Sequence, residues 1–156
     1  QSSPEDPEYY LRRDYRGNYD INGSLFLQAD CILGESGNLT IYGHNMNSGA
    51  MFGNLDQYAS YDYWKAHPRV FFQTPGGMEE YRIAAVLKAD VSMFDFQRIS
   101  FQSPQELEAY VAQAKALSLF ETGVDGIGCE KTLTLVTCSY EWKQARNILV
   151  AVKTGA

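Results

Sequence analysis

The stretch TLTLVTCSYEWKQARNILVAVK, residues 132–153, says most about the fold. Its two ends, KTLTLVTC (131–138) and RNILVAVK (146–153), are rich in the β-branched and aliphatic residues of buried strands. We therefore expect two neighbouring strands joined by a short polar segment. A cysteine, Cys138, ends the first strand and an arginine, Arg146, opens the second. Strand packing needs neither residue type, so both are candidates for a functional role.

Further strands are expected upstream of this pair. SLFL (24–27) and LTIYGHN (39–45) have strand-like composition, and 69–91 divides into two runs around the hairpin turn Thr74–Gly77. The spacing of apolar residues predicts a helix over 51–65, closed by Pro68. A mostly-β barrel is therefore favoured over a parallel α/β sheet.

The clearest helix signal is SPQELEAYVAQAKALSLF, residues 103–120. Ser103 at the N-cap, Pro104 at the first helical position and Glu106 two residues later form a capping box. Apolar residues then recur on one face of the predicted helix. The two helices are expected as insertions in the β structure.

Length and composition place the chain among single globular domains. Its 156 residues, predicted here as one domain (1–156), are 45% hydrophobic and 21% charged, which suits one folded core. The formal net charge is -6, and the longest basic run is the pair Arg12-Arg13. This balance argues against nucleic acid or an anionic membrane as the main partner and favours a peptide or small molecule. No run of apolar residues is long enough for a transmembrane helix.

The three cysteines, Cys31, Cys129 and Cys138, are too few and too scattered for a disulfide scaffold. An odd number leaves at least one free thiol, although a bridge between Cys31 and Cys129 remains an alternative if the fold brings them within reach. The closely spaced pairs of a structural zinc site are missing, so no metal site is expected.

Cys138 and His44 both stand at the ends of predicted strands. A thiol becomes a strong nucleophile as the thiolate, and a nearby imidazole can activate it. On residue type alone, Cys138 more often is a buried structural thiol, and His44 a turn histidine bonded to the backbone. The other histidine, His67, is expected as a surface cap at a helix end.

Arg146 follows Cys138 by eight positions, so a short loop would return it beside the thiol. Its guanidinium could stabilise an oxyanion or hold a substrate carbonyl, although a solvated charge at a strand start is the commoner role. Other cysteine chemistries fit less well. A tyrosine-phosphatase pattern would need arginine where Gln144 stands, papain-like enzymes place cysteine before histidine, and the caspase signature is missing.

Three segments resemble the sortase family. TLVTC (134–138) is similar to its TLxTC signature, IYGHNM (41–46) to its histidine segment, and RNILVAVK (146–153) to its arginine strand. YYLRRDYRGNYDINGSLFL (9–27) extends the similarity over nearly the whole chain. A helix before LFETGV (119–124) resembles class B sortases in particular.

The resemblance implies a sortase-like β-barrel and a cysteine transpeptidase with three catalytic residues. Cys138 would be the nucleophile, His44 the general acid and base, and Arg146 the oxyanion or substrate-positioning group. The enzyme would cleave an NPQTN or NPKTN type sorting motif after threonine, near the C-terminus of a secreted protein. It would pass the acyl group to an amine of a peptidoglycan precursor, with hydrolysis as a side activity. No metal or organic cofactor is required.

The resemblance also implies partners and a location. The partners are the sorting-signal peptide and the peptidoglycan amine, and the site is the outer face of the cytoplasmic membrane of a Gram-positive bacterium, with the full-length protein anchored there. A pilin-polymerising sortase, a catalytically silent module that binds the sorting peptide, and a plain thiol peptidase remain alternatives.

Substrate contacts are expected from the residues that flank the nucleophile and from the helix insertion. The resemblance points to the region 103–128 and, by residue, to Asn22, Val136, Thr137, Ser139 and Tyr140. Class B relatives ordinarily carry two N-terminal helices and a first barrel strand before the segment that begins this sequence. We therefore expect an N-terminally truncated barrel with an exposed edge that can associate with another copy.

Overall fold

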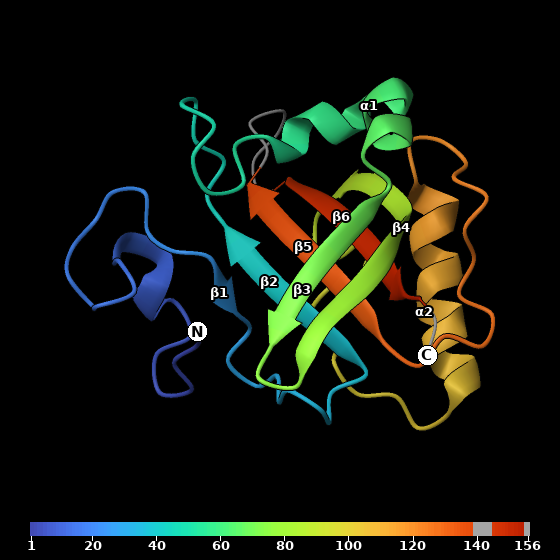
Figure 1. The fold of residues 1–156 in the computed structure, drawn as a ribbon, viewed down its shortest axis with the longest axis horizontal. Coiled ribbons are helices and arrows are strands. Elements are labelled where there is room, and N and C mark those ends of the chain that lie inside the picture. Colours follow the sequence, from blue (N-terminus) through green and yellow to red (C-terminus); the bar gives the residue numbers. More distant parts are fainter. Residues whose placement is uncertain (139–144, 155–156) are drawn as a thin grey trace.

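The computed structural model describes residues 1–138 and 145–154. One six-stranded sheet dominates it, with the strand order β1-β2-β5-β6-β4-β3 (Figure 1). The strands are β1 (Phe26–Leu27), β2 (Asn38–Gly43), β3 (Arg69–Thr74), β4 (Gly77–Ala89), β5 (Thr132–Cys138) and β6 (Arg146–Lys153). The helices are α1 (Tyr61–Ala66) and α2 (Pro104–Leu117), with 3-10 turns η1 (Tyr9–Arg12) and η2 (Leu55–Ala59).

The sheet is curled into a half-barrel, because β3 and β4 bend forward over β2, β5 and β6 (Figure 1). The pair β2–β5 is parallel, and the other neighbours are antiparallel. Among the described strands, β1 and β3 form the two edges. The expected mostly-β architecture with two helices is confirmed, in the form of a half-barrel.

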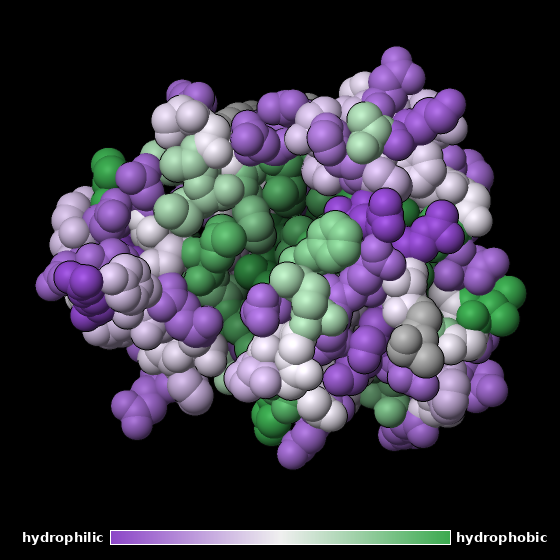
Figure 2. Space-filling model, in the orientation of Figure 1, coloured by the Kyte–Doolittle hydropathy of each residue, from purple (hydrophilic) through white to green (hydrophobic). Residues whose placement is uncertain are grey.

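The two faces of the sheet carry separate cores. One face, called here the α2 face, packs apolar side chains of β4, β5 and β6 such as Val136 and Ile148 against Tyr110 and Val111 of α2. The opposite face, called here the η2 face, packs others such as Leu135 and Leu149 against Leu55 of η2 and Trp64 of α1. Figure 2 looks onto the η2 face and shows a hollow lined by hydrophobic side chains. Successive residues of one strand therefore meet different surroundings.

The capping box begins α2 as expected. The Ser103 side chain accepts a hydrogen bond from the Glu106 amide (3.3 Å), and Pro104 stands in the first turn. The Glu106 carboxylate reaches back to the Gln102 amide (2.8 Å) and also pairs with Arg98 (2.7 Å). Backbone donors before and within the first turn thus find side-chain acceptors.

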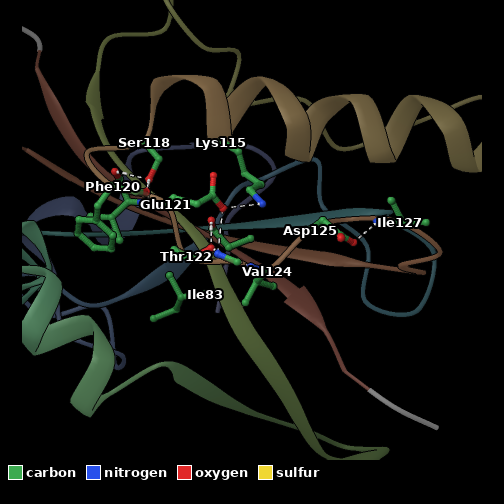
Figure 3. A network of polar contacts seen from close by, with 12 residues as sticks. Ile83, Lys115, Ser118, Phe120, Glu121, Thr122, Val124, Asp125 and Ile127 are labelled. Carbon is green, nitrogen blue, oxygen red and sulfur yellow. Dashed lines mark hydrogen bonds and ion pairs between the residues drawn. The ribbon is translucent and has the colours of Figure 1, made fainter.

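The segment after α2 runs along β4 and is tied to it by polar contacts (Figure 3). The Ser118 hydroxyl accepts from the Val86 amide (3.1 Å), the Thr122 hydroxyl donates to the Ala84 carbonyl (2.7 Å), and Lys115 pairs with Glu121 (3.0 Å). These contacts fix the connection between α2 and β5.

A buried polar network joins β2, β5 and α2. Asn38 accepts hydrogen bonds from the hydroxyls of Thr132 (2.8 Å) and Thr134 (2.9 Å), and donates to Tyr110 of α2 (3.2 Å) and to the Arg98 carbonyl (2.8 Å). Buried polar groups are stable only with such partners. The network therefore fixes how β2 and β5 align.

Two expected elements differ in detail. The predicted helix over 51–65 is wrong in its extent: η2 and α1 stand there, separated by Ser60. Ser60 is extended and its side chain caps α1 at Tyr63, while Met51 has a left-handed backbone (φ 54). Serine favours capping over the helix interior, so it divides the segment. The strand predicted at 24–27 is shorter and comprises only β1.

The other elements agree with expectation. β2 ends at Gly43, one residue before His44. The Thr74–Gly77 turn joins β3 and β4, and Gly77 has a positive backbone φ angle of 125°. His67 is exposed and caps the end of α1.

Within the described residues, none of the helices has the length and apolar character needed to cross a membrane.

Candidate active site

The strand register brings together the backbone positions of His44, Cys138 and Arg146. In the parallel pair β2–β5, Gly43 lies opposite Thr137, so the next residue on each chain, His44 and Cys138, stands at the same level. In the antiparallel pair β5–β6, Cys138 lies opposite Arg146. The three positions therefore lie side by side where β2 and β5 end and β6 begins (Figure 1).

Gly43 sets the close packing just before His44. A Cβ atom at this position would lie 2.4 Å from Leu25 Cδ2 and 2.8 Å from Phe52 Cδ2, so a larger residue would push these neighbours away. His44 follows, and its carbonyl accepts from the Phe52 amide (2.9 Å). This packing holds the histidine turn against the end of β2.

The His44 ring contacts the N-terminal segment. Its Nε2 lies 2.5 Å from the backbone carbonyl oxygen of Leu11 in η1. A carbonyl can only accept a hydrogen bond, so Nε2 carries a proton, and Nδ1 is the ring nitrogen left to accept one. The N-terminal segment thus fixes the tautomer of the imidazole.

Arg146 is half-buried at the start of β6, and its Nη1 donates to the carbonyl of Ala145 (3.1 Å). The guanidinium has five N–H donors in total, so this contact uses only part of its capacity. Arg146 and His44 both line one cavity of about 1010 Å³. Tyr42, Phe96 and Val136, which belong to the α2-face core or pack against it, line the same cavity.

The walls of this cavity come from four parts of the chain: the N-terminal segment, β1 with the residues after it, the end of β2 and β5 with the start of β6, and the segment between β4 and α2. Its lining residues are Pro4, Pro7, Glu8, Leu11, Phe26, Gln28, Ala29, Asp30, Tyr42, Gly43, His44, Asp90, Val91, Asp95, Phe96, Gln97, Val136, Thr137 and Arg146. A cavity of this size with an apolar wall and a few polar groups suits an extended peptide.

The cavity combines acidic groups with two basic side chains, those of His44 and Arg146. Four carboxylates, from Glu8, Asp30, Asp90 and Asp95, stand around it. The Ser92 hydroxyl, followed by the amides of Ser92 and Met93, lowers the pKa of Asp90, so this group is charged at neutral pH.

Tyr42 provides a neutral donor in the same wall. Burial raises the pKa of its phenol, which stays protonated and donates to Gln28 Oε1 (2.6 Å).

The expected substrate residues fall into three groups. Val136 and Thr137 line the cavity together with His44 and Arg146. Asn22 lies in the N-terminal segment and does not line the cavity, and its backbone amide donates to Asp20 Oδ1 (2.9 Å). Ser139 and Tyr140 lie outside the described residues.

Sequence reasoning missed two contributions to the site. One wall of the cavity comes from residues 90–97, the segment that leads into α2. Residues 115–127, which follow α2 and were expected near the substrate, are instead tied mainly to β4 by their described contacts. The residues 4–11 form another wall. No sequence pattern predicts these contacts, because both segments are irregular and reach the site only through the curl of the sheet.

Cys31 is buried and Cys129 half-buried, and both are free thiols, so the alternative of a bridge between them does not hold in this structure. Within 1–138 and 145–154, no group of three His, Cys, Asp or Glu side chains is placed to hold a metal ion.

Comparison with known proteins defines the family. A sequence model of the sortase domain matches residues 8–154. Sortase B of Listeria monocytogenes is 31% identical over 142 residues, which are 88% of this chain and 56% of that protein. The chain therefore belongs to the sortase family, a family of cysteine transpeptidases.

Solved structures agree on the class and the fold. The crystal structure of sortase B from Listeria monocytogenes superimposes with a TM-score of 0.82 and 27% identity, over 99% of this chain and 84% of that one. A Staphylococcus aureus sortase B–substrate complex superimposes with a TM-score of 0.85 and 21% identity, over 97% of this chain and 71% of that one. Within its family the chain is a class B sortase. It spans a little over half the length of the curated relative from Listeria.

Proposed function

We propose that this chain is a cysteine transpeptidase in which Cys138 is the nucleophile, His44 the general acid and base, and Arg146 the oxyanion-stabilising group. The observation that carries the proposal is the register of β2, β5 and β6, which sets these three residues side by side at one end of the sheet. A nucleophile, a proton carrier and a fixed cation at one edge are the groups that acyl transfer requires.

The reaction follows from these roles. The Cys138 thiolate attacks the carbonyl carbon of the scissile peptide bond, and Arg146 stabilises the negative charge that forms on the carbonyl oxygen. His44 gives a proton to the leaving amine as the C–N bond breaks, and a thioester remains. An incoming amine then attacks the thioester carbonyl carbon and loses a proton to His44, and the C–S bond breaks to release the Cys138 thiolate. His44 regains, during attack of the amine on the thioester, the proton that it gave while the thioester formed, so no net acid or base is consumed.

The substrate is a C-terminal sorting signal of the NPQTN or NPKTN type, cleaved after threonine, and the acceptor is an amine of a peptidoglycan precursor. The Staphylococcus aureus relative was solved with a substrate, which supports peptide binding by this fold. The large cavity beside His44 and Arg146, with Val136 and Thr137 in its wall, is the place where we expect the peptide. Asn22, Ser139 and Tyr140 remain predicted substrate contacts.

The acyl transfer anchors surface proteins to the cell wall, on the outer face of the cytoplasmic membrane of a Gram-positive bacterium. The full-length protein is membrane-anchored there. Hydrolysis of the thioester by water is the expected side reaction when no amine is present.

A fluorogenic NPQTN-type peptide tests the proposal. We expect cleavage by the chain, loss of cleavage in Cys138→Ala, and a ligated product of the predicted mass when an amine acceptor is added. Peptide binding without cleavage would instead indicate a silent binding module, and cleavage that never yields the ligated product would indicate a thiol peptidase. Activity retained by Cys138→Ala would refute the proposed nucleophile.

A further inference from the structure

Asp56 of η2 joins the two chain segments that carry His44 and Arg146. Its Oδ2 accepts a hydrogen bond from Asn45 Nδ2 (2.8 Å), and its Oδ1 accepts one from Asn147 Nδ2. Asn45 directly follows His44, and Asn147 directly follows Arg146. We propose that Asp56 is a positioning residue that holds the His44 turn and the Arg146 strand in register from behind the active site. This inference rests on the proposed function.

The Asn45 and Asn147 side chains point away from the face of the sheet that carries Arg146. His44 and Arg146 line the cavity, whereas the next residue on each segment points toward η2, as the alternation of side chains along extended chains requires. In strand order, β5 lies between β2 and β6. The Asp56 carboxylate therefore bridges the neighbours on both sides of the strand that ends in Cys138.

Asp56 supplies an acceptor to two buried amides. Asn45 and Asn147 are 6% and 5% exposed, and a buried amide N–H group without an acceptor is costly. A carboxylate has two oxygens and no donor, so it can accept from each amide with a separate oxygen, whereas a neutral amide in its place would offer one oxygen and turn its own NH2 group toward one of them. The residue type at position 56 thus matches what the two asparagines present.

Asp56 itself stands on a fixed support. Leu55, the residue before it, is buried in the η2-face core with Phe52 and Trp64, and the Tyr58 hydroxyl donates to the His67 carbonyl (3.0 Å). The His44 turn is held to the same segment by the bridge between Asn45 and Met51. A rigid support is needed because an acyl-transfer site loses rate when its groups shift by small distances.

The test compares Asp56→Ala with Asp62→Ala, an exposed carboxylate in the first turn of α1. Thermal unfolding is measured first, and kinetics are run at a temperature where every variant is folded. For Asp56→Ala we expect kcat to fall on the order of ten- to a hundred-fold with KM nearly unchanged, since Asp56, Asn45 and Asn147 are not among the residues that line the cavity. Asp62→Ala is expected to match the parent protein. The kinetics must be run on fully folded protein, because a partly unfolded sample would also lower the apparent kcat with KM unchanged.

Two further variants sharpen the result. Asp56→Asn keeps one oxygen acceptor, so its loss of kcat is expected to be smaller than that of Asp56→Ala. If Asp56 acts through Asn147, the double variant Asp56→Ala/Asn147→Ala is no slower than Asp56→Ala alone. Three results would each overturn the inference. The first is a double variant whose loss of kcat is the product of the two single losses. The others are a rise in KM with kcat unchanged and a kcat for Asp56→Ala equal to that of Asp62→Ala.

Cys138→Ala in the same assay separates the two proposals. If the parent cleaves, Cys138→Ala does not, and Asp56→Ala behaves like the parent, then only the role of Asp56 is refuted. If Cys138→Ala still cleaves, the proposed function fails, whatever Asp56→Ala does.

Discussion

Arg146 lies directly opposite Cys138 across the antiparallel pair of β5 and β6, as the first residue of β6. Its position is therefore set by strand pairing. A side chain on a paired strand varies less in position than one on a loop, and this suits a group that must meet developing charge at a fixed point.

Replacing Arg146 tests this role. Arg146→Ala and Arg146→Lys are both expected to lower kcat/KM on the order of a hundred-fold, because lysine keeps the charge but lacks the planar fork of donors. The free energy of unfolding should change little, since the described contact of the side chain is with its neighbouring carbonyl. A peptide cleavage assay measures kcat/KM, and chemical denaturation measures the free energy of unfolding. Arg82→Lys, at an exposed position, is the control. Full activity in Arg146→Lys would show that charge alone suffices.

The Asn38 network predicts a large stability effect. Asn38→Ala leaves the hydroxyls of Thr132 and Thr134 and the Arg98 carbonyl without this partner, so we expect the free energy of unfolding to fall by about 3 kcal/mol. Tyr110→Phe removes one hydroxyl of the network and should cost about 1 kcal/mol. Denaturant titration measures both. Equal losses in the two variants would contradict the central place of Asn38.

Glu121 predicts a pH dependence of stability. The Gly123 amide, followed by Lys115, holds the pKa of Glu121 below its ordinary value of 4.5. Because the folded-state pKa is the lower one, this contribution is present above pH 4.5 and is lost as the pH falls from there through the folded-state pKa. Unfolding measured at successive pH values should show a shallower acid dependence for Glu121→Gln than for the parent. Parallel curves would contradict this.

The free cysteines predict slow thiol chemistry. Burial raises the pKa of both Cys31 and Cys129 above the ordinary 9.0, so few thiolates are present at pH 8. In Cys138→Ala, alkylation by iodoacetamide should be slow in the folded protein and fast after unfolding, as followed by mass spectrometry. If the unfolded protein does not react with iodoacetamide and its mass is lower by two hydrogens, Cys31 and Cys129 form a disulfide bridge instead.

The sequence was a good guide where hydrophobic pattern and capping determine structure. β5, β6 and α2 begin or end within a few residues of their predicted bounds, because uninterrupted apolar runs and the Ser103 cap act locally. The His44, Cys138 and Arg146 positions come together as the strand ends suggested.

The parts that were missed depend on contacts distant in sequence. The division of 51–65 into η2 and α1 follows from the Ser60 cap, and the cavity walls at 4–11 and 90–97 have no periodic pattern. In the sequence, Asp56 resembles any other carboxylate. Only the structure, in which β5 brings the end of β2 beside the start of β6, shows that two buried amides converge on it.

The parallel pairing of β2 with β5 also bears on how the molecule folds. Asn38 and Thr132, which share a hydrogen bond, are 94 residues apart, with β3, β4 and α2 between them in the chain. Closing so long a loop is slow compared with forming a hairpin or a helix, and a high contact order lowers the folding rate. The edge that carries His44, Cys138 and Arg146 is therefore complete only in chains that have closed this long loop.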